Sequence, residues 1–146
     1  MRLLLDTNVL IDYFAGREPY HADAFRLRMM HEFGDAELWA SVQSFADIAY
    51  ILRGETDGGT LQDAFRESLS FLHVCSLDED DLRWATTEKW EDFEDCLIER
   101  CAEKTKAEAI LSRDAQGFAR ARTSVLTPQA FFERLASQQG LTYELM

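Results

Sequence analysis

One aspartate in an otherwise apolar amino-terminal run constrains the fold most. The chain begins MRLLLDTNVLIDYF, in which Asp6 is the only charged residue between Arg2 and Asp12. A carboxylate among positions typical of a core is costly unless it is paired or binds a metal. Residues 3–5 predict a short buried strand, and a helix is expected from about Asn8. The rest of the chain must therefore supply the groups that pair with Asp6 or share a metal with it at the end of that strand.

Length and composition indicate one compact domain over residues 1–146, with 47% hydrophobic residues arguing against disorder. No apolar run approaches the length of a membrane span and no signal-peptide pattern opens the chain, so a soluble, cytoplasmic protein is expected.

The three cysteines, Cys75, Cys96 and Cys101, form no CxxC pair. Together with three scattered histidines they make no zinc signature. Reduced thiols packed in the core are expected.

The net charge of −12, from 27 acidic and 15 basic residues, restricts the possible partners. A protein that holds nucleic acid by phosphate neutralisation alone is normally basic, so this balance counts against a simple nucleic-acid binder. It is compatible with divalent cations, a basic protein partner or plain solubility. The only lysines are Lys89, Lys104 and Lys106, and the predominance of arginine slightly favours phosphate or interface contacts.

Hydrophobic periodicity predicts strands and helices in alternation. The expected strands cover 3–5, 38–41, 71–77, 107–112 and 124–127. The first expected helix begins near residue 8, and the others cover 22–33, 45–52, 61–69, 78–90, 92–105 and 128–137. This alternation is typical of right-handed crossovers and a mostly parallel sheet covered on both faces. In such sheets ligands bind beyond the carboxyl ends of the strands, so the residues just after each strand are the place to look for chemistry.

Asp6 and Asp114 both follow predicted strands. Asp6, Thr7 or Asn8 could simply cap the next helix, and an aspartate after a strand is commonly a turn former. Capping alone does not explain so polar a trio as residues 6–8. The value of Asp114 lies in its match to the position of Asp6.

Two further acids lie on predicted helices. Asp47 is the only charged residue between Glu37 and Arg53, on a helix that is apolar nearly all round and is therefore expected to be buried. In the segment WEDFEDCLIER, acids near a helix start complement the helix dipole. Asp95 lies at the rim of the apolar stripe and is interpreted as the site acid. Asp92 is interpreted as the cap or a supporting polar group, and Glu91 and Glu94 as surface residues.

Carboxylates gathered at one sheet edge would repel one another, and burial without compensation would raise their pKa values. A hard divalent cation resolves both problems with oxygen ligands, and Mg²⁺ typically takes a few carboxylates and keeps several waters. Two such ions could activate water and stabilise the leaving oxygen of an in-line phosphoryl displacement.

The segments LLLDTNVLID, SFADIAYILR, DFEDCLIERCAEKTKAEAILSRDAQGF and SVLTPQAFFERL, in this order, resemble the PIN domain, in the branch of VapC-type toxin ribonucleases. The resemblance implies a three-layer α/β/α sandwich around a mostly parallel five-stranded sheet with strand order 3-2-1-4-5. It also implies Mg²⁺- or Mn²⁺-dependent hydrolysis of RNA phosphodiester bonds.

By motif position, the resemblance assigns metal binding and catalysis to Asp6, Asp95 and Asp114, with Asp47 completing or tuning the site. Thr7, Asn8 and Ser112 match polar positions that orient ligands and water. The family often has Glu at position 47, and the shorter side chain of Asp47 leaves open whether it binds metal directly or through water. Arg113, Arg120 and Arg122 follow the last acid and are candidates for RNA phosphate contacts, although ordinary surface arginines are an equally good interpretation.

The family also implies a small antitoxin partner with a basic or aromatic tail, which suits the acidic chain, and commonly a homodimer. Other interpretations stay open: a noncatalytic PIN-like protein-binding module, or a housekeeping RNA-processing nuclease. A receiver domain would require paired acids after the first strand and a lysine at a strand end, whereas Lys104 and Lys106 do not lie at the end of a predicted strand. A haloacid-dehalogenase-type phosphatase would expect Asp-x-Asp, which Asn8 breaks.

Overall fold

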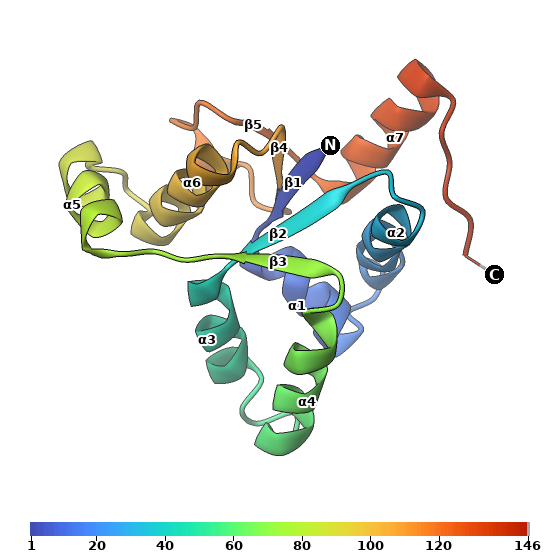
Figure 1. Cartoon of the computed structure of the whole chain (residues 1–146), viewed down its shortest axis with the longest axis horizontal. Helices are drawn as coiled ribbons and strands as arrows, with labels where there is room; N and C mark the ends of the chain where they lie inside the picture. The colour runs from blue at the N-terminus through green and yellow to red at the C-terminus, as the bar shows by residue number, and fades with distance from the viewer. Residues whose placement is uncertain (146) are drawn as a thin grey trace.

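A five-stranded, all-parallel sheet organises the chain, with strand order β3-β2-β1-β4-β5. A computed structural model describes residues 1–145 (Figure 1). The strands are β1 (Arg2–Leu5), β2 (Glu37–Ser41), β3 (Leu72–Cys75), β4 (Ala109–Leu111) and β5 (Ser124–Leu126). The predicted α/β class, the parallel sheet and the 3-2-1-4-5 order are confirmed.

Seven α-helices and one short 3-10 helix connect and cover the strands within residues 1–145. They are α1 (Thr7–Ala15), α2 (His21–Glu32), α3 (Val42–Ile51), α4 (Gly58–Ser68), α5 (Glu79–Glu88), α6 (Phe93–Thr105), the 3-10 helix η1 (Gln116–Phe118) and α7 (Pro128–Gln139). Each α-helix corresponds to one predicted from periodicity. The 3-10 helix was not predicted, because a single turn is too short to show a hydrophobic period.

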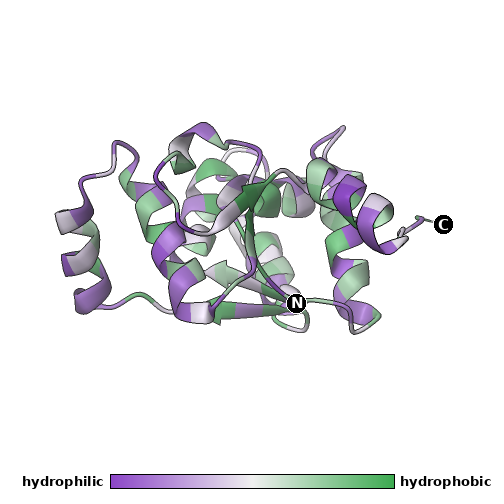
Figure 2. Ribbon diagram, turned by 90° about the horizontal axis from the view of Figure 1, so that it is seen from above, coloured by the Kyte–Doolittle hydropathy of each residue, from purple (hydrophilic) through white to green (hydrophobic). Residues whose placement is uncertain are grey.

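Strand β1 supplies both halves of the core because side chains alternate across a strand. Leu3 and Leu5 join a cluster with residues of α1, α2 and α7, whereas Leu4 joins the cluster formed with α6. In Figure 1, α5 and α6 lie on one side of the sheet and α2 and α7 on the other. Figure 2 shows mostly hydrophobic strands between helices that carry both kinds of residue. This is the expected three-layer sandwich.

Polar residues at helix starts fix where the helices begin. The side chains of Asp6, Ser41, Asp57, Asp92 and Thr127 each accept a hydrogen bond from a backbone N–H of the helix that follows. Because several of these caps end parallel strands, capping brings polar side chains to the carboxyl edge of the sheet. The cysteines are free thiols and buried, as predicted.

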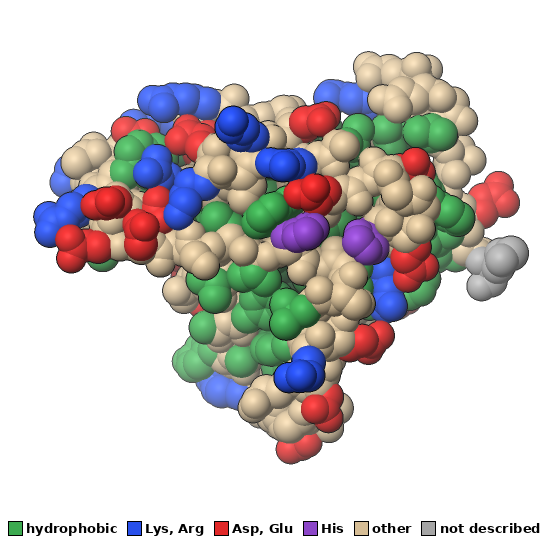
Figure 3. Space-filling view, viewed as in Figure 1, with side chains coloured by type: hydrophobic (Ala, Val, Ile, Leu, Met, Phe, Trp, Pro, Cys, Tyr) green, Lys and Arg blue, Asp and Glu red, His purple; other side chains and the backbone are tan. Residues whose placement is uncertain are grey.

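The prediction that α3 is buried nearly all round is wrong. Only Ser44 and Ile48 of this helix are buried, whereas Tyr50 is 66% exposed and Val42 47%. Figure 3 shows hydrophobic side chains gathered on the lower part of one face, where Figure 1 places α3 and α4. An apolar helix surface is thus left uncovered in the single chain.

None of the helices in residues 1–145 is long and apolar enough to cross a membrane.

Candidate active site

The carboxyl ends of β1, β2 and β4 meet at one edge of the sheet and surround a cavity of about 260 Å³. Leu5 pairs with Leu111, and the backbone N–H of Asp6 donates to the carbonyl of Leu111 at 2.9 Å. This register places Asp6 beside Ser112. The chain runs from β1 to β2 on one side and returns to β4 on the other, so the cavity lies at the topological switch point where ligands bind in such sheets.

Ser112 connects the residues that follow β1 and β4. Its hydroxyl donates to Oδ2 of Asp6 at 2.8 Å and accepts from Nδ2 of Asn8 at 3.2 Å and from the backbone N–H of Asp114 at 3.0 Å. Oδ1 of Asp6 accepts from the backbone N–H of Thr7 at 2.8 Å. The Asp6 carboxylate is therefore held in one orientation by hydrogen bonds to both oxygens. Thr7 itself contacts the Ser44 hydroxyl at 2.8 Å.

Helix α6 presents Asp95 to the same cavity. Asp92 caps the helix by accepting from the backbone N–H of Asp95 at 3.1 Å, which is the capping role predicted for it. Burial raises the pKa of Asp95 to about 7, and the nearby carboxylates of Asp6, Asp92 and Asp114 add to the shift. The pKa of Asp6 is also raised, first by burial and further by Asp114 and Asp92, against the lowering effect of its hydrogen bonds.

Asp47 and Glu94 complete the acidic lining from α3 and α6. Oδ1 of Asp47 accepts from Nε2 of Gln43 at 3.3 Å, and its side chain is half-buried. Glu94, interpreted from sequence as a surface residue, is exposed but lines the cavity. Its pKa is raised by burial and by Asp47, Asp92 and Asp6. The structure thus brings Asp6, Asp47, Asp95 and Asp114 to one cavity.

The acids do not form a closed metal cage. Across residues 1–145, no three His, Cys, Asp or Glu side chains are grouped closely enough to hold an ion among themselves. The donors are oxygen atoms of carboxylates at an open cavity, and no lysine or arginine of the described residues lines it. Such an arrangement fits a hard cation that keeps several water ligands better than it fits zinc.

Arg113 has an intramolecular partner that the sequence did not reveal. Its Nε and Nη2 atoms donate to the two carboxylate oxygens of Asp12 at 2.7 and 3.1 Å, and its guanidinium lies 4.0 Å from the ring centre of Tyr20. Asp12 is 1% exposed. The guanidinium proposed for RNA contact is therefore engaged in a structural ion pair.

The other two candidate arginines differ from each other. Arg122 is exposed, with Glu103 at 3.6 Å and Glu88 at 3.9 Å, whereas Arg120 lines a second cavity beside the acidic one.

Glu99, on the α6 face shared with Asp92 and Asp95, is buried and accepts from the backbone N–H groups of Arg122 and Thr123. Glu99 thus anchors the segment that follows the last site acid.

Sequence reasoning missed Asp12 and Gly117. Asp12 was noted only as the next charge after Asp6, although a lone acid one and a half helical turns into an apolar segment is the same signal as Asp6 itself. Gly117 lies in the 3-10 helix against Asp95. Nothing in the sequence distinguishes it from an ordinary turn glycine.

A parallel sheet with acids converging at its switch point defines a class of α/β proteins with an acidic site suited to a divalent cation. The sequence matches the family model described as PIN domain over residues 2–116, and the chain belongs to the PIN domain family. No curated protein matches the sequence.

Solved structures share the fold at low sequence identity. VapBC2 from Rickettsia felis bound to a promoter DNA fragment matches with a TM-score of 0.65 at 15% identity, covering 87% of this chain and 98% of that chain. A toxin–antitoxin complex from Klebsiella pneumoniae matches with a TM-score of 0.62 at 21% identity, covering 86% of this chain and 97% of that chain. FitAcB from Neisseria gonorrhoeae matches with a TM-score of 0.59 at 19% identity, covering 87% of this chain and 98% of that chain.

Proposed function

We propose that this chain is a Mg²⁺- or Mn²⁺-dependent endoribonuclease and the toxin of a type II toxin–antitoxin pair. One observation carries the proposal: Asp6, Asp95 and Asp114 converge on one cavity where no lysine or arginine neutralises them. The burial of Asp6 and Asp95 and the repulsion among the three carboxylates are unfavourable in the chain alone. A protein keeps such an arrangement where a cation or a reacting group requires it.

The residues present fit a divalent cation. Asp6, Asp95 and Asp114 would hold it together with several water ligands, and Asp47, which is half-buried and set on a neighbouring helix, would complete or tune the site directly or through water. When bound, the ion supplies Lewis acidity and a lowered pKa for water. Among residues 1–145 no histidine lines the cavity, so the carboxylates are the charged residues available to position the attacking water.

The chain's own residues hold this geometry in place. Ser112 and the backbone N–H of Thr7 keep the Asp6 carboxylate oriented, while Asn8 and the N–H of Asp114 keep the Ser112 hydroxyl oriented. Partners of this kind fix metal ligands, and their loss typically lowers metal affinity or activity 10- to 100-fold. Thr7, Asn8 and Ser112 are therefore proposed as positioning residues.

The toxin role and the antitoxin partner are supported by the fold shared with the toxin–antitoxin complexes named above. A small antitoxin with a basic or aromatic tail would complement the acidic cavity and the net charge of −12. We also propose a cytoplasmic homodimer. The uncovered apolar surface of α3 is compatible with a partner chain.

Cleavage of a structured RNA pool in Mn²⁺ or Mg²⁺ tests the proposal, with wild type, Asp6→Asn and Asp63→Asn compared after removal of any copurified partner. Asp63 is an exposed acid on α4, away from the cavity, and serves as the matched control. We expect metal-dependent cleavage by wild type and Asp63→Asn and its loss in Asp6→Asn.

Folded but inactive wild-type protein would favour the noncatalytic PIN-like module. Cleavage that survives in Asp6→Asn would place the active site elsewhere or reveal a contaminating nuclease. Expression of this chain with and without the neighbouring gene distinguishes a toxin from a housekeeping nuclease. Growth arrest that a small protein from the neighbouring gene relieves supports the toxin. Expression without growth arrest supports a housekeeping RNA-processing nuclease.

A further inference from the structure

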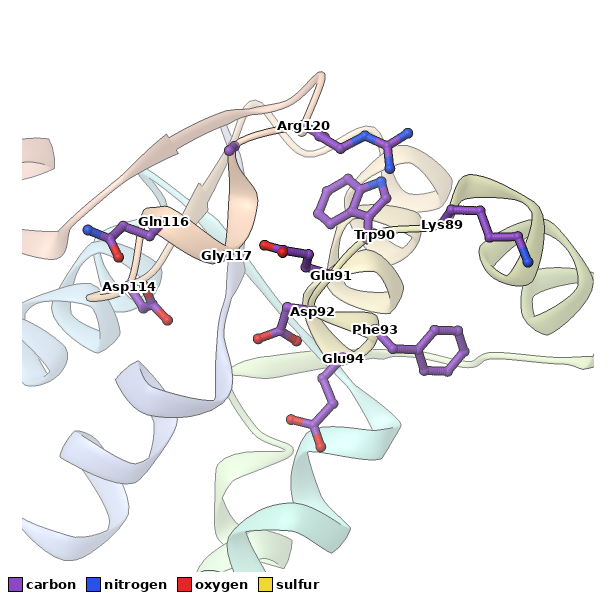
Figure 4. Close-up of a pocket in the computed structure, with 11 residues that line it drawn as sticks. Lys89, Trp90, Glu91, Asp92, Phe93, Glu94, Asp114, Gln116, Gly117 and Arg120 are labelled. Atoms are coloured by element: carbon purple, nitrogen blue, oxygen red, sulfur yellow. The ribbon is translucent and has the colours of Figure 1, made fainter.

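The segment that connects β4 to β5, residues 112–123, carries Asp114 to the acidic cavity, and we call it the return loop. Figure 4 shows Asp114 and Gly117 of this loop opposite Asp92 at the start of α6. Asp95 lies on α6, whereas Asp114 lies on the loop. The distance between these two acids therefore depends on how the return loop is held against α6.

The middle of the return loop is a compact unit because its backbone is hydrogen-bonded to itself. The N–H groups of Phe118, Ala119 and Ala121 donate to the carbonyls of Ala115, Gln116 and Phe118 at 3.1, 3.3 and 2.9 Å. These bonds join the middle of the loop into consecutive turns. A displacement at the β5 end of the loop is therefore transmitted toward the end that carries the site acid.

Glu99 of α6 holds the β5 end of the return loop. Its Oε1 atom accepts from the backbone N–H groups of Arg122 at 3.0 Å and Thr123 at 3.2 Å. Within residues 1–145, no other side chain accepts a hydrogen bond from the backbone of residues 115–123. Glu99 is 1% exposed, so water does not compete for these two bonds.

Two acids that lie one turn apart on α6 thus contact the return loop. Gly117 packs against the carboxylate of Asp95, and the N–H groups further along the loop bind Glu99. Residues four apart lie on the same face of a helix. The acid proposed as a metal ligand and the acid that anchors the loop are therefore fixed relative to each other by one helix.

The second oxygen of Glu99 indicates a role beyond stability. Oε2 is buried and has no hydrogen-bond partner among residues 1–145. The pKa of Glu103, one turn further on, is raised by its own burial and then by Glu99. An apolar side chain of similar volume is often neutral or stabilising in place of such a buried charge. A chain keeps an unfavourable group of this kind where it serves a functional site.

We infer that Glu99 is a positioning residue for the cation site, because its carboxylate holds the return loop where Asp114 meets Asp6 and Asp95 at the cavity. This role rests on the divalent cation of the proposed function and adds to the site a residue that does not line the cavity. Glu99 acts on the cation only through the loop.

Glu99→Met and Glu99→Gln are the decisive variants. Both keep the length of the side chain, but Gln keeps an oxygen that accepts from the two N–H groups, whereas Met offers only a weakly accepting thioether. Binding of Mn²⁺ without RNA is measured from the electron paramagnetic resonance signal of the free ion. We expect Glu99→Met to lower the affinity for Mn²⁺ at least about tenfold, as for loss of other groups that orient metal ligands, and Glu99→Gln to keep it close to that of wild type.

Hydrogen exchange tests whether Glu99 acts through the loop. In the metal-free protein, the amides of Phe118, Ala119 and Ala121 should exchange faster in Glu99→Met than in Glu99→Gln, because the turns they close are no longer anchored. Unchanged exchange in Glu99→Met would show that Glu99 does not hold the loop and would overturn its positioning role.

Two controls separate positioning from a general loss of stability. Glu103→Met removes a carboxylate of the same helix that lies 3.6 Å from the Arg122 side chain, and it should leave the affinity for Mn²⁺ unchanged. Leu61→Ala opens the core at α4, away from the cavity, and should lower the unfolding temperature with the same affinity. If Leu61→Ala weakened Mn²⁺ binding as much as Glu99→Met, affinity would follow stability and the role of Glu99 would be overturned.

The outcomes distinguish this role from the proposed function. If Asp6→Asn loses Mn²⁺ but Glu99→Met binds it like wild type, only the role of Glu99 is overturned. Equal losses in Glu99→Met and Glu99→Gln also overturn it, because the charge rather than the two hydrogen bonds would then matter. Wild type that binds no Mn²⁺ overturns the cation of the proposed function, and the positioning role with it.

Discussion

Gly117 lies directly against the carboxylate of Asp95. A Cβ built on Gly117 would overlap Oδ2 of Asp95 and lie 3.0 Å from its Cγ. The same Cβ would lie 3.6 Å from Oδ2 of Asp92, an ordinary contact. The absence of a side chain at position 117 therefore lets the 3-10 helix close against the acid that α6 presents to the cavity.

Gly117→Ala is expected to lower the apparent affinity for Mn²⁺ at least about tenfold, because the new methyl group must displace the Asp95 carboxylate. The Mn²⁺-dependent rise in unfolding temperature measures this affinity without requiring cleavage. Gly54→Ala is the matched control, since a Cβ there meets nothing within 4 Å. Equal Mn²⁺ affinity in the two variants would show that Asp95 does not contribute to cation binding.

The stability of the metal-free protein should fall as the pH rises from about 4 to about 7 and then level off. The pKa of Asp95 is raised from its ordinary value of 3.8 to about 7, chiefly by burial. An acid with a raised folded-state pKa stabilises the fold fully below its unfolded pKa, and this contribution is lost as the pH rises through the folded value. Raising the pKa of a carboxyl group from 3.8 to about 7 corresponds to an upper limit of ~4 kcal/mol in the free energy of unfolding.

Asp95→Asn removes this penalty, so the variant should become more stable than wild type at pH 8 in chelator, by at least about 1 kcal/mol. Urea unfolding at pH 5 and pH 8 measures the difference, which should widen at the higher pH. Glu91→Gln, at an exposed neighbouring position, should show no widening. A constant difference between wild type and Asp95→Asn would mean that Asp95 is ionised throughout this range.

The order of strands and helices could be predicted because each element has a clear hydrophobic period and a recognisable end. Leu3–Leu5 forms a short apolar strand before Asp6, and Pro128 opens the last helix after Thr127. The exposure of α3 could not be predicted, because a helix that is apolar nearly all round is equally apolar whether a neighbour covers it or not. Only the tertiary arrangement shows that Val42 and Tyr50 have no cover in the single chain.

The rule that ligands bind beyond the carboxyl ends of parallel strands predicted the positions of Asp6 and Asp114, whereas Asp47 and Asp95 were interpreted as site acids from their places on apolar helices. The contacts that support these acids could not be predicted. The hydrogen bond from Ser112 to Asp6 joins residues 106 positions apart, and the Asp12–Arg113 pair joins residues 101 apart. Spacing along one sequence cannot show such pairs, because they depend on strand register and on the direction of each side chain.

Asp47→Asn should reduce cleavage less than Asp6→Asn or Asp95→Asn. Asp47 is half-buried and accepts a single long hydrogen bond from Gln43, whereas both oxygens of Asp6 are held. A ligand acting through water typically contributes 10- to 100-fold, so we expect a decrease in kcat/KM within that range. Single-turnover cleavage at saturating Mn²⁺ compares the three variants. Complete loss of activity in Asp47→Asn would make Asp47 a direct ligand.

Loss of the Asp12–Arg113 pair should destabilise the fold rather than act on RNA alone. Arg113→Ala leaves the 1%-exposed Asp12 without its partner, which typically costs about 3 kcal/mol or more. At about 2–4 °C per kcal/mol for a chain of this size, the unfolding temperature should fall by roughly 6–12 °C. Arg122→Ala, which removes an exposed arginine 3.6 Å from Glu103, should change stability by no more than about 0.5 kcal/mol.

The double variant Asp12→Ala/Arg113→Ala completes the comparison. Arg113→Ala leaves the Asp12 carboxylate buried without its partner, and Asp12→Ala removes that carboxylate. The loss of stability in the double variant should therefore be smaller than the sum of the losses in the two single variants. Additive losses would show that the two side chains act independently. If Arg113→Ala instead weakened RNA binding and left the free energy of unfolding unchanged, Arg113 would be an RNA contact, and the ion pair with Asp12 would contribute nothing to the fold.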